Sequence, residues 1–143
     1  MDFNQLSEFV TNHPLLVMAF VVLLAILIGG ELKRRISGVQ QITPGEATRL
    51  LNHENAIMVD VRGDKEFRDG HVVNAVHLPV KDRDIDNRLD KYRDRPLIVY
   101  CNNGQQSAQL CGKLRKQGFE SVYNLKGGVL AWQRSELPLA RGK

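Results

Sequence analysis

A cysteine stands where a short apolar run gives way to a polar loop. The run covers residues 97–100, the loop is CNNGQQS at residues 101–107, and a helical pattern follows over about residues 107–117. The thiol of Cys101 would face the unpaired backbone N–H groups and the positive dipole end of that helix. Such surroundings lower a cysteine pKa from about 8.5 into the range of roughly 3.5 to 7.5. The pattern therefore favours a nucleophilic thiolate.

The remaining loop residues suit a small anion. Gly104 allows a tight turn because glycine adopts a positive φ without strain. The expected anion pocket consists of Asn102, Asn103, Gly104, Gln105, Gln106 and Ser107. A cysteine at the end of a strand is often plain core, so spacing alone leaves both interpretations of Cys101 open. The second cysteine, Cys111, falls on the apolar face of the helix and is expected to be inert.

The elements around the loop alternate between strands and helices. Expected strands cover residues 56–61, 76–78, 97–100 and 122–125. Expected helices cover residues 43–52, 85–92, 107–117 and 128–133, the first beginning with a capping box from Thr43 to Glu46. This alternation predicts an α/β fold with a small, mostly parallel sheet flanked by helices. Ligands bind at the carboxyl ends of strands in such sheets, and Cys101 stands at one.

The N-terminal part of the chain has a different character. Residues 9–30 contain no Asp, Glu, Lys or Arg, and residues 15–28 are apolar throughout. About twenty such residues suffice for a helix to cross a bilayer. A cleaved signal peptide is the competing interpretation, but Asp2 and Glu8 stand where such a peptide carries basic residues. We therefore expect one uncleaved transmembrane helix over about residues 10–30.

Basic residues indicate how this helix is oriented. Lys33, Arg34 and Arg35 follow the apolar run directly, and such clusters favour the cytoplasmic side. The sequence predicts a single-pass protein of the inner (plasma) membrane, with its N-terminus outside and its C-terminal domain in the cytoplasm, where thiols stay reduced. The expected organisation is an N-terminal segment, a basic juxtamembrane linker and a C-terminal domain, at residues 1–30, 31–41 and 42–143.

Several short motifs at ordered intervals support a more specific interpretation. They are Asp60-Val61-Arg62, Glu66-Phe67, Gly70-His71-Val72, Ala75, Leu78-Pro79, Tyr100-Cys101, Leu125-Lys126-Gly127-Gly128 and Trp132. Over about residues 40–140 this pattern resembles the signature of rhodanese domains. The resemblance implies a sulfurtransferase in which Cys101 takes sulfane sulfur as a persulfide from a small sulfur-containing anion or a persulfide donor. A thiol or another nucleophile would then accept the sulfur, and no cofactor is expected.

The loop departs from the commonest rhodanese pattern at two positions. Rhodaneses often carry arginine directly after the cysteine and again five residues after it, where this sequence has Asn102 and Gln106. The second arginine would grip an oxyanion such as the sulfonate of thiosulfate. Losing one charge-assisted hydrogen bond costs about 1.5–3 kcal/mol, so we expect weakened thiosulfate use. The alternative is a catalytically idle rhodanese fold that serves as an interaction module for other membrane proteins.

The composition argues against other classes of site. The net charge of +4 is mild, and the basic cluster beside the apolar run lacks interleaved aromatic residues, which favours contact with lipid over nucleic-acid binding. The histidines are scattered and the cysteines form no C-x-x-C pair, so no metal site is expected. Asp60 is expected to bond to neighbouring backbone rather than to transfer protons, and Arg62 to pair with Glu66 across one turn if that segment is helical.

Overall fold

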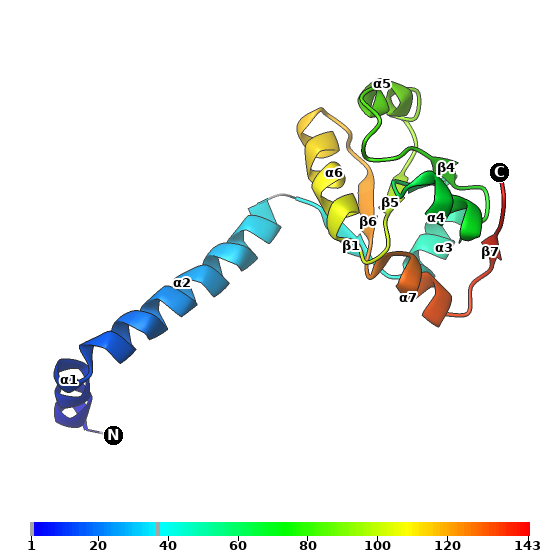
Figure 1. Ribbon diagram of the computed structural model, residues 1–143. Helices are drawn as coiled ribbons and strands as arrows, with labels where there is room; N and C mark the ends of the chain where they lie inside the picture. The colour runs from blue at the N-terminus through cyan, green and yellow to red at the C-terminus, as the bar shows by residue number, and fades with distance from the viewer. Residues whose placement is uncertain (1, 37) are drawn as a thin grey trace. The chain divides into compact units, whose positions relative to one another are not determined.

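The N-terminal unit consists of two helices. The computed structural model describes residues 2–36 and 38–143, and the chain divides into two compact units, residues 1–37 and 38–143. In the first unit, helix α1 (Phe3–Asn12) precedes helix α2 (Pro14–Ile36) (Figure 1). The break falls before Pro14, because proline has no N–H to continue a helix but fits well at the start of one. Helix α1 was not predicted from the sequence, and its last residues fall within the transmembrane helix expected over about residues 10–30.

Helix α2 is long and apolar enough to cross a membrane. Its stretch Pro14–Lys33 is 20 residues long and has a mean hydropathy of 2.7. The continuation of α2 to Ile36 takes up the first residues of the segment expected as a linker.

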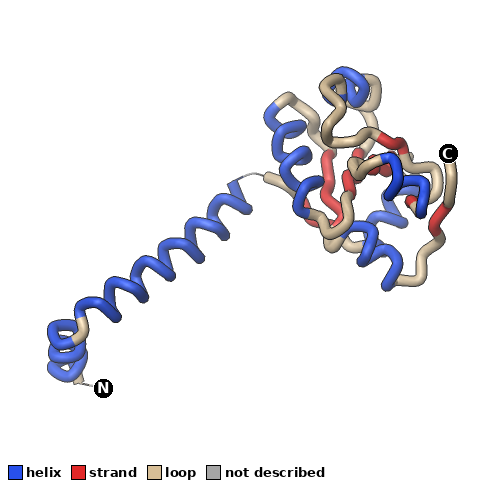
Figure 2. The backbone as a smooth tube through the Cα atoms, in the orientation of Figure 1, coloured by secondary structure: helices blue, strands red, loops and turns tan. Residues whose placement is uncertain are grey.

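The second unit is built on a five-stranded sheet. Its strands are β1 (Gln40–Ile42), β2 (Ile57–Asp60), β4 (Val76–His77), β5 (Leu97–Tyr100) and β6 (Val122–Leu125). They lie in the order β1-β6-β5-β2-β4, and every neighbouring pair is parallel (Figures 1 and 2). A separate antiparallel pair joins β3 (His71–Val72) to β7 (Leu139–Ala140). The predicted α/β fold with a mostly parallel sheet is confirmed.

Five helices accompany this sheet, and four of them pack on it in two layers. They are α3 (Pro44–His53), α4 (Asp64–Asp69), α5 (Ile85–Asp90), α6 (Gln105–Lys116) and α7 (Gly128–Arg134). One core cluster joins the sheet to α5 and α6, and a second joins the opposite face to α3 and α7. The sheet is therefore buried on both faces, which explains why its central strands read as continuous apolar runs.

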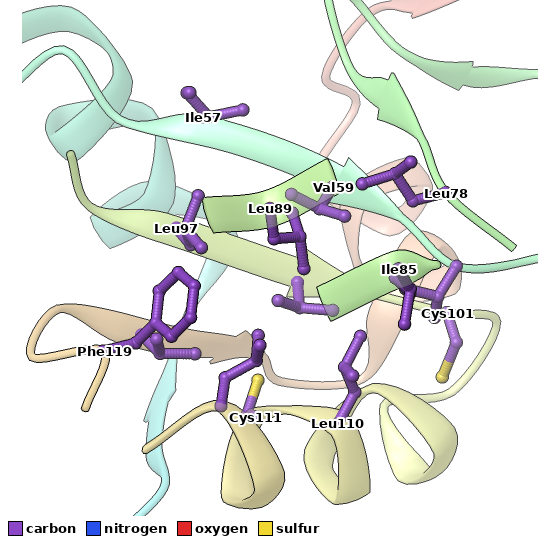
Figure 3. Close-up of a cluster of buried hydrophobic side chains, with 14 residues drawn as sticks. Ile57, Val59, Leu78, Ile85, Leu89, Leu97, Cys101, Leu110, Cys111 and Phe119 are labelled. Carbon is purple, nitrogen blue, oxygen red and sulfur yellow. The ribbon is translucent and has the colours of Figure 1, made fainter. Parts of the chain in front are cut away.

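Strand β5 shows how this arrangement positions the cysteine. Leu97 and Val99 belong to the core beneath α5 and α6, whereas Ile98 and Tyr100 belong to the core on the opposite face. Successive side chains of a strand point to opposite faces, so Cys101 continues the Leu97 and Val99 series. Figure 3 shows Cys101 at the edge of that core, with its sulfur toward the first turns of α6.

The structure corrects several of the expected element boundaries. The capping box is present, since Thr43 Oγ1 accepts from the Glu46 N–H at 3.3 Å and Glu46 Oε2 accepts from the Thr43 N–H at 2.7 Å. Helix α6 begins at Gln105, two residues earlier than the apolar periodicity indicated. The strands β1, β3 and β7 and helix α4 were not predicted as elements. All four are short. Strands β1 and β3 also contain polar residues, and only their pairing with distant strands makes them extended.

Candidate active site

The Cys101 thiol lies at the carboxyl end of β5, under the first turn of α6. The residue is 2% exposed. The Gly104 N–H donates to Cys101 Sγ at 3.1 Å, and Ser107 Oγ lies 3.3 Å from the same sulfur. Gly104 has a φ of +92°, a left-handed conformation in which its N–H turns back toward the sulfur. The loop therefore surrounds Sγ with polar hydrogens, although the thiol itself is nearly buried.

These contacts decide the acidity of the thiol. Burial acts to raise the pKa of Cys101, but hydrogen bonds from the Ser107 hydroxyl and from the N–H groups of Ser107, Gly104 and Asn103 outweigh it. The pKa of Cys101 is therefore lowered from its ordinary value. The other thiol in the same core behaves oppositely, because burial, helped by the neighbouring charge of Cys101, raises the pKa of Cys111 to about 12.

A buried asparagine on β6 forms hydrogen bonds that hold the loop. Asn124 Nδ2 donates to Gly104 O at 2.9 Å and to Gln41 Oε1 at 2.9 Å, while its Oδ1 accepts from Ser107 Oγ at 2.6 Å. The hydroxyl of Ser107 has one proton, so it donates either to Asn124 or to Cys101 Sγ. Ser107 stabilises the thiolate when this proton turns to the sulfur, whereas the Gly104 N–H already points there.

Helix α7 holds the carbonyl groups of the loop. The Val129 N–H donates to Cys101 O at 2.9 Å, and the Leu130 N–H donates to Asn102 O at 3.3 Å. A Cβ atom placed on Gly128 would lie 2.4 Å from Cys101 O and 2.5 Å from Asn102 O. Only glycine fits between the loop and α7 at that position. The Gly127-Gly128 motif is thus part of the support of the loop.

The expected site residues divide into two groups. Cys101, Gly104 and Ser107 are buried and in mutual contact, while Asn102, Asn103, Gln105 and Gln106 are exposed at the rim. Two of the exposed residues bind within the fold: Asn102 Nδ2 donates to Glu66 Oε1 at 2.5 Å, and Asn103 Oδ1 accepts from the Gln105 N–H at 3.1 Å. The Gln105 N–H is therefore already occupied, and Gln106 is exposed beside the loop.

The ion pair expected between Arg62 and Glu66 is absent from residues 2–36 and 38–143. Arg62 instead pairs with Asp60, with 2.6 Å between Nη2 and Oδ2, and both side chains are buried. The Asp60 carboxylate also accepts from the Arg62 N–H at 2.9 Å, as the sequence predicted for neighbouring backbone. Glu66 lies on the outer side of α4, where Asn102 and the Gly63 N–H donate to it. The Asp60-Val61-Arg62 motif therefore forms a buried ion pair that stabilises the backbone at the end of β2.

Sequence reasoning missed Asn124, Glu66 and Gly128 as supports of the loop. A signal was available for Asn124, because an asparagine interrupts the otherwise apolar strand expected at residues 122–125. Glu66 belongs to the Glu66-Phe67 motif, but nothing in that motif indicates its contact with the distant Asn102. In the described part of the chain, no three His, Cys, Asp or Glu side chains are grouped so that they could hold a metal ion.

Comparison with known proteins shows which family this chain resembles. Residues 43–135 match the family model described as the Rhodanese-like domain. The chain is 39% identical over 142 residues to the uncharacterised protein YibN of Escherichia coli K12, covering 98% of this chain and 99% of YibN. It is also 39% identical over 103 residues to the thiosulfate sulfurtransferase GlpE of Glaesserella parasuis, covering 71% of this chain and 94% of GlpE.

A solved structure agrees with these sequence matches. The crystal structure of the Alr3790 protein from Anabaena has a TM-score of 0.64 and 28% identity, covering 71% of this chain and 82% of that one. The matched residues 43–135 contain β2, β5, the Cys101 loop and α7, which are the elements that build the site. The chain belongs to the rhodanese-like domain family.

Proposed function

We propose that this protein is a membrane-anchored sulfurtransferase that carries sulfane sulfur as a persulfide on Cys101. The observation that carries the proposal is the set of contacts around Cys101 Sγ, with the Gly104 N–H at 3.1 Å and Ser107 Oγ at 3.3 Å. These donors lower the pKa of the thiol and would also stabilise the negative charge of a persulfide. Membership of a family that includes sulfurtransferases supports the same chemistry.

The proposed reaction has two displacement steps. The Cys101 thiolate attacks the sulfane sulfur of a donor such as thiosulfate, the S–S bond of the donor breaks, and sulfite leaves with the electron pair. The enzyme then holds Cys101–S–S⁻. An acceptor thiolate attacks the outer sulfur, the bond to Sγ breaks, and its electron pair regenerates the Cys101 thiolate. Atoms and electrons balance without any cofactor.

Helix α2 is proposed as the membrane anchor. Its stretch Pro14–Lys33 is sufficiently long and apolar to span a bilayer. The cluster of Lys33, Arg34 and Arg35 near the end of α2 would contact anionic lipid and keep residues 38–143 in the cytoplasm. The similarity to YibN extends through this N-terminal segment. The proposed location is the inner membrane, with the N-terminus outside.

The second candidate function is an interaction module without sulfur transfer. The observation that favours it is the composition of the loop, in which Asn102 is bound to Glu66 and Gln106 has no charge. A loop without a cationic side chain binds a doubly charged donor weakly. In this alternative, the domain would recruit other membrane proteins and Cys101 would have no turnover.

Persulfide formation separates the two functions. Full-length protein in detergent is incubated with thiosulfate or inorganic polysulfide. Mass spectrometry then identifies which cysteine carries added sulfur. We expect the mass of one added sulfur atom on Cys101 in wild type and in Cys111→Ser, and none in Cys101→Ser. If no donor produces a persulfide on Cys101, the enzyme proposal fails and the module is the better explanation.

A further inference from the structure

A pocket of about 290 Å³ adjoins the Cys101 loop. In the pairing of β2 with β5, Asp60 is opposite Tyr100, so Val61 and Cys101 are the next residues along two neighbouring strands. Val61 and Gln106 both line the pocket, which places it at the carboxyl ends of the strands, beside the loop. The residues that matter for its chemistry are Val61, Arg62, Glu66, Val80, Lys81 and Gln106.

The charged side chains of this pocket are not equivalent. The Arg62 guanidinium is neutralised by Asp60 at 2.6 Å and also donates to Gly70 O at 2.7 Å. Lys81 is exposed and forms no ion pair within residues 2–36 or 38–143. Hydrogen bonds from Asn102 and from the Gly63 N–H lower the pKa of Glu66, so its carboxylate is charged at neutral pH. The walls thus present one available positive charge and one negative charge.

This combination discriminates between ligands. A dianion such as thiosulfate is attracted by Lys81 but repelled by Glu66. A ligand with both a carboxylate and an ammonium group can satisfy both side chains at once, and a pocket of this volume suits a molecule the size of one amino acid. The exposed apolar side chain of Val80 and the amide of Gln106 are suited to contact the rest of such a ligand.

We propose that this pocket binds the amino-carboxylate end of a small thiol of the amino-acid type, which accepts the sulfur from Cys101. Lys81 pairs with the carboxylate and Glu66 with the ammonium group. The inference rests on the proposed function, since the bound thiolate attacks the outer sulfur of the Cys101 persulfide. The bond to Sγ breaks, its electron pair returns to Cys101, and the acceptor leaves as a persulfide.

Acceptors with different charges test this assignment. Full-length protein in detergent is loaded with sulfur, and the rate constant of transfer is measured for L-cysteine, cysteamine, 3-mercaptopropionate and 2-mercaptoethanol. Lys81→Met should lower the rates for L-cysteine and 3-mercaptopropionate, relative to 2-mercaptoethanol, by roughly two- to five-fold, as expected for an exposed ion pair. The ratio of cysteamine to 2-mercaptoethanol should not fall, because cysteamine has no carboxylate for Lys81 to bind. Each acceptor is compared with itself across variants, so its intrinsic reactivity cancels.

Lys116→Met is the matched control, because Lys116 is an exposed lysine at the far end of α6 and its loss changes the net charge equally. It should leave all the ratios as in wild type. Identical ratios in wild type and Lys81→Met overturn the assignment while leaving the sulfurtransferase proposal intact. If no persulfide forms, S-methyl-L-cysteine, which cannot react, serves as the probe. If the probe shifts the amide NMR signals of Val80 and Gln106 in wild type but not in Lys81→Met, the binding site is supported. If it shifts neither signal in wild type, the assignment of the pocket is refuted.

Discussion

The two cysteines show how a few atoms change the chemistry of one residue type. Cys101 and Cys111 are both buried and belong to the same core cluster. The Gly104 N–H reaches the sulfur of Cys101 at 3.1 Å, whereas the sulfur of Cys111 contacts a carbonyl oxygen, Tyr123 O, at 3.5 Å. Burial acts to raise the pKa of both thiols, but hydrogen bonds donated to Cys101 outweigh it and lower the pKa of that thiol. The pKa of Cys111 is instead raised, by burial and by the neighbouring charge of Cys101.

Alkylation should therefore distinguish the two thiols. At neutral pH we expect iodoacetamide to label Cys101 much faster than Cys111, because only the thiolate reacts and the pKa of Cys101 is lowered while that of Cys111 is raised to about 12. The Cys101 rate should level off as the pH rises through its lowered pKa, while the Cys111 rate should keep rising toward pH 12. Site-resolved mass spectrometry at a series of pH values measures both. Equal rates at neutral pH would contradict the assignment of the site.

The missing arginine can be restored at one position. Gln106 is exposed at the rim of the loop, on the wall of the pocket. Gln106→Arg should raise kcat/KM for thiosulfate by roughly ten-fold, which corresponds to about 1.4 kcal/mol of regained anion binding. Steady-state kinetics at low thiosulfate measure this gain, and Cys101→Ser should abolish turnover in either background. Gln133→Arg on α7 adds the same charge elsewhere and should have little effect. An equal gain in kcat/KM in both variants would mean that the gain comes from the net charge of the protein and not from an arginine beside the loop.

At the scale of elements, the close packing of α7 against the loop leaves no room for a side chain at Gly128. Gly128 has a φ of +61°, and an added Cβ would lie 2.4 Å from Cys101 O. Gly128→Ala should therefore lower the free energy of unfolding by about 2–4 kcal/mol, combining backbone strain with overpacking. Trp132, the one tryptophan of the sequence, is 4% exposed, so its fluorescence during urea unfolding reports on the second unit alone.

Gly45→Ala in α3 is the matched control for this substitution. Its added Cβ would meet only Thr43 Oγ1, at 4.0 Å, and alanine favours a helix over glycine by up to about 1 kcal/mol. It should leave stability unchanged or raise it slightly. If both variants unfold at the same urea concentration, the contact between α7 and the loop is looser than the distances indicate.

The sequence predicted those elements whose patterns are local. Strands β5 and β6 and the start of α3 were placed correctly because an apolar run or a capping box marks them within a few residues. Strand β1 is specified by its pairing with β6, and β7 by its pairing with β3, and no local pattern encodes either pairing. The same limit applied to the site: the loop was visible, but the contacts of Asn124 and Glu66 with it depend on long-range packing.

At the scale of the whole molecule, an apolar helix and a compact α/β unit share one chain. Helix α1 adds a feature that apolar composition alone did not reveal, since its residues Phe3, Leu6 and Val10 recur at helical spacing and are all exposed. If α2 spans a bilayer, the chain must also choose which side holds residues 38–143. That choice decides whether Cys101 meets a reducing or an oxidising compartment.

A reporter that is active only in the cytoplasm should work when fused after Lys143. The reason is the basic cluster at Lys33, Arg34 and Arg35, which resists transfer across the membrane, while the segment before α2 contains no lysine or arginine. Replacing the cluster with glutamine and introducing Asn4→Lys and Gln5→Arg should reverse the charge difference and reduce the reporter signal. An external C-terminus in the wild-type fusion would overturn the orientation. It would also expose Cys101 to an oxidising compartment, where a persulfide carrier would need a separate source of reduction.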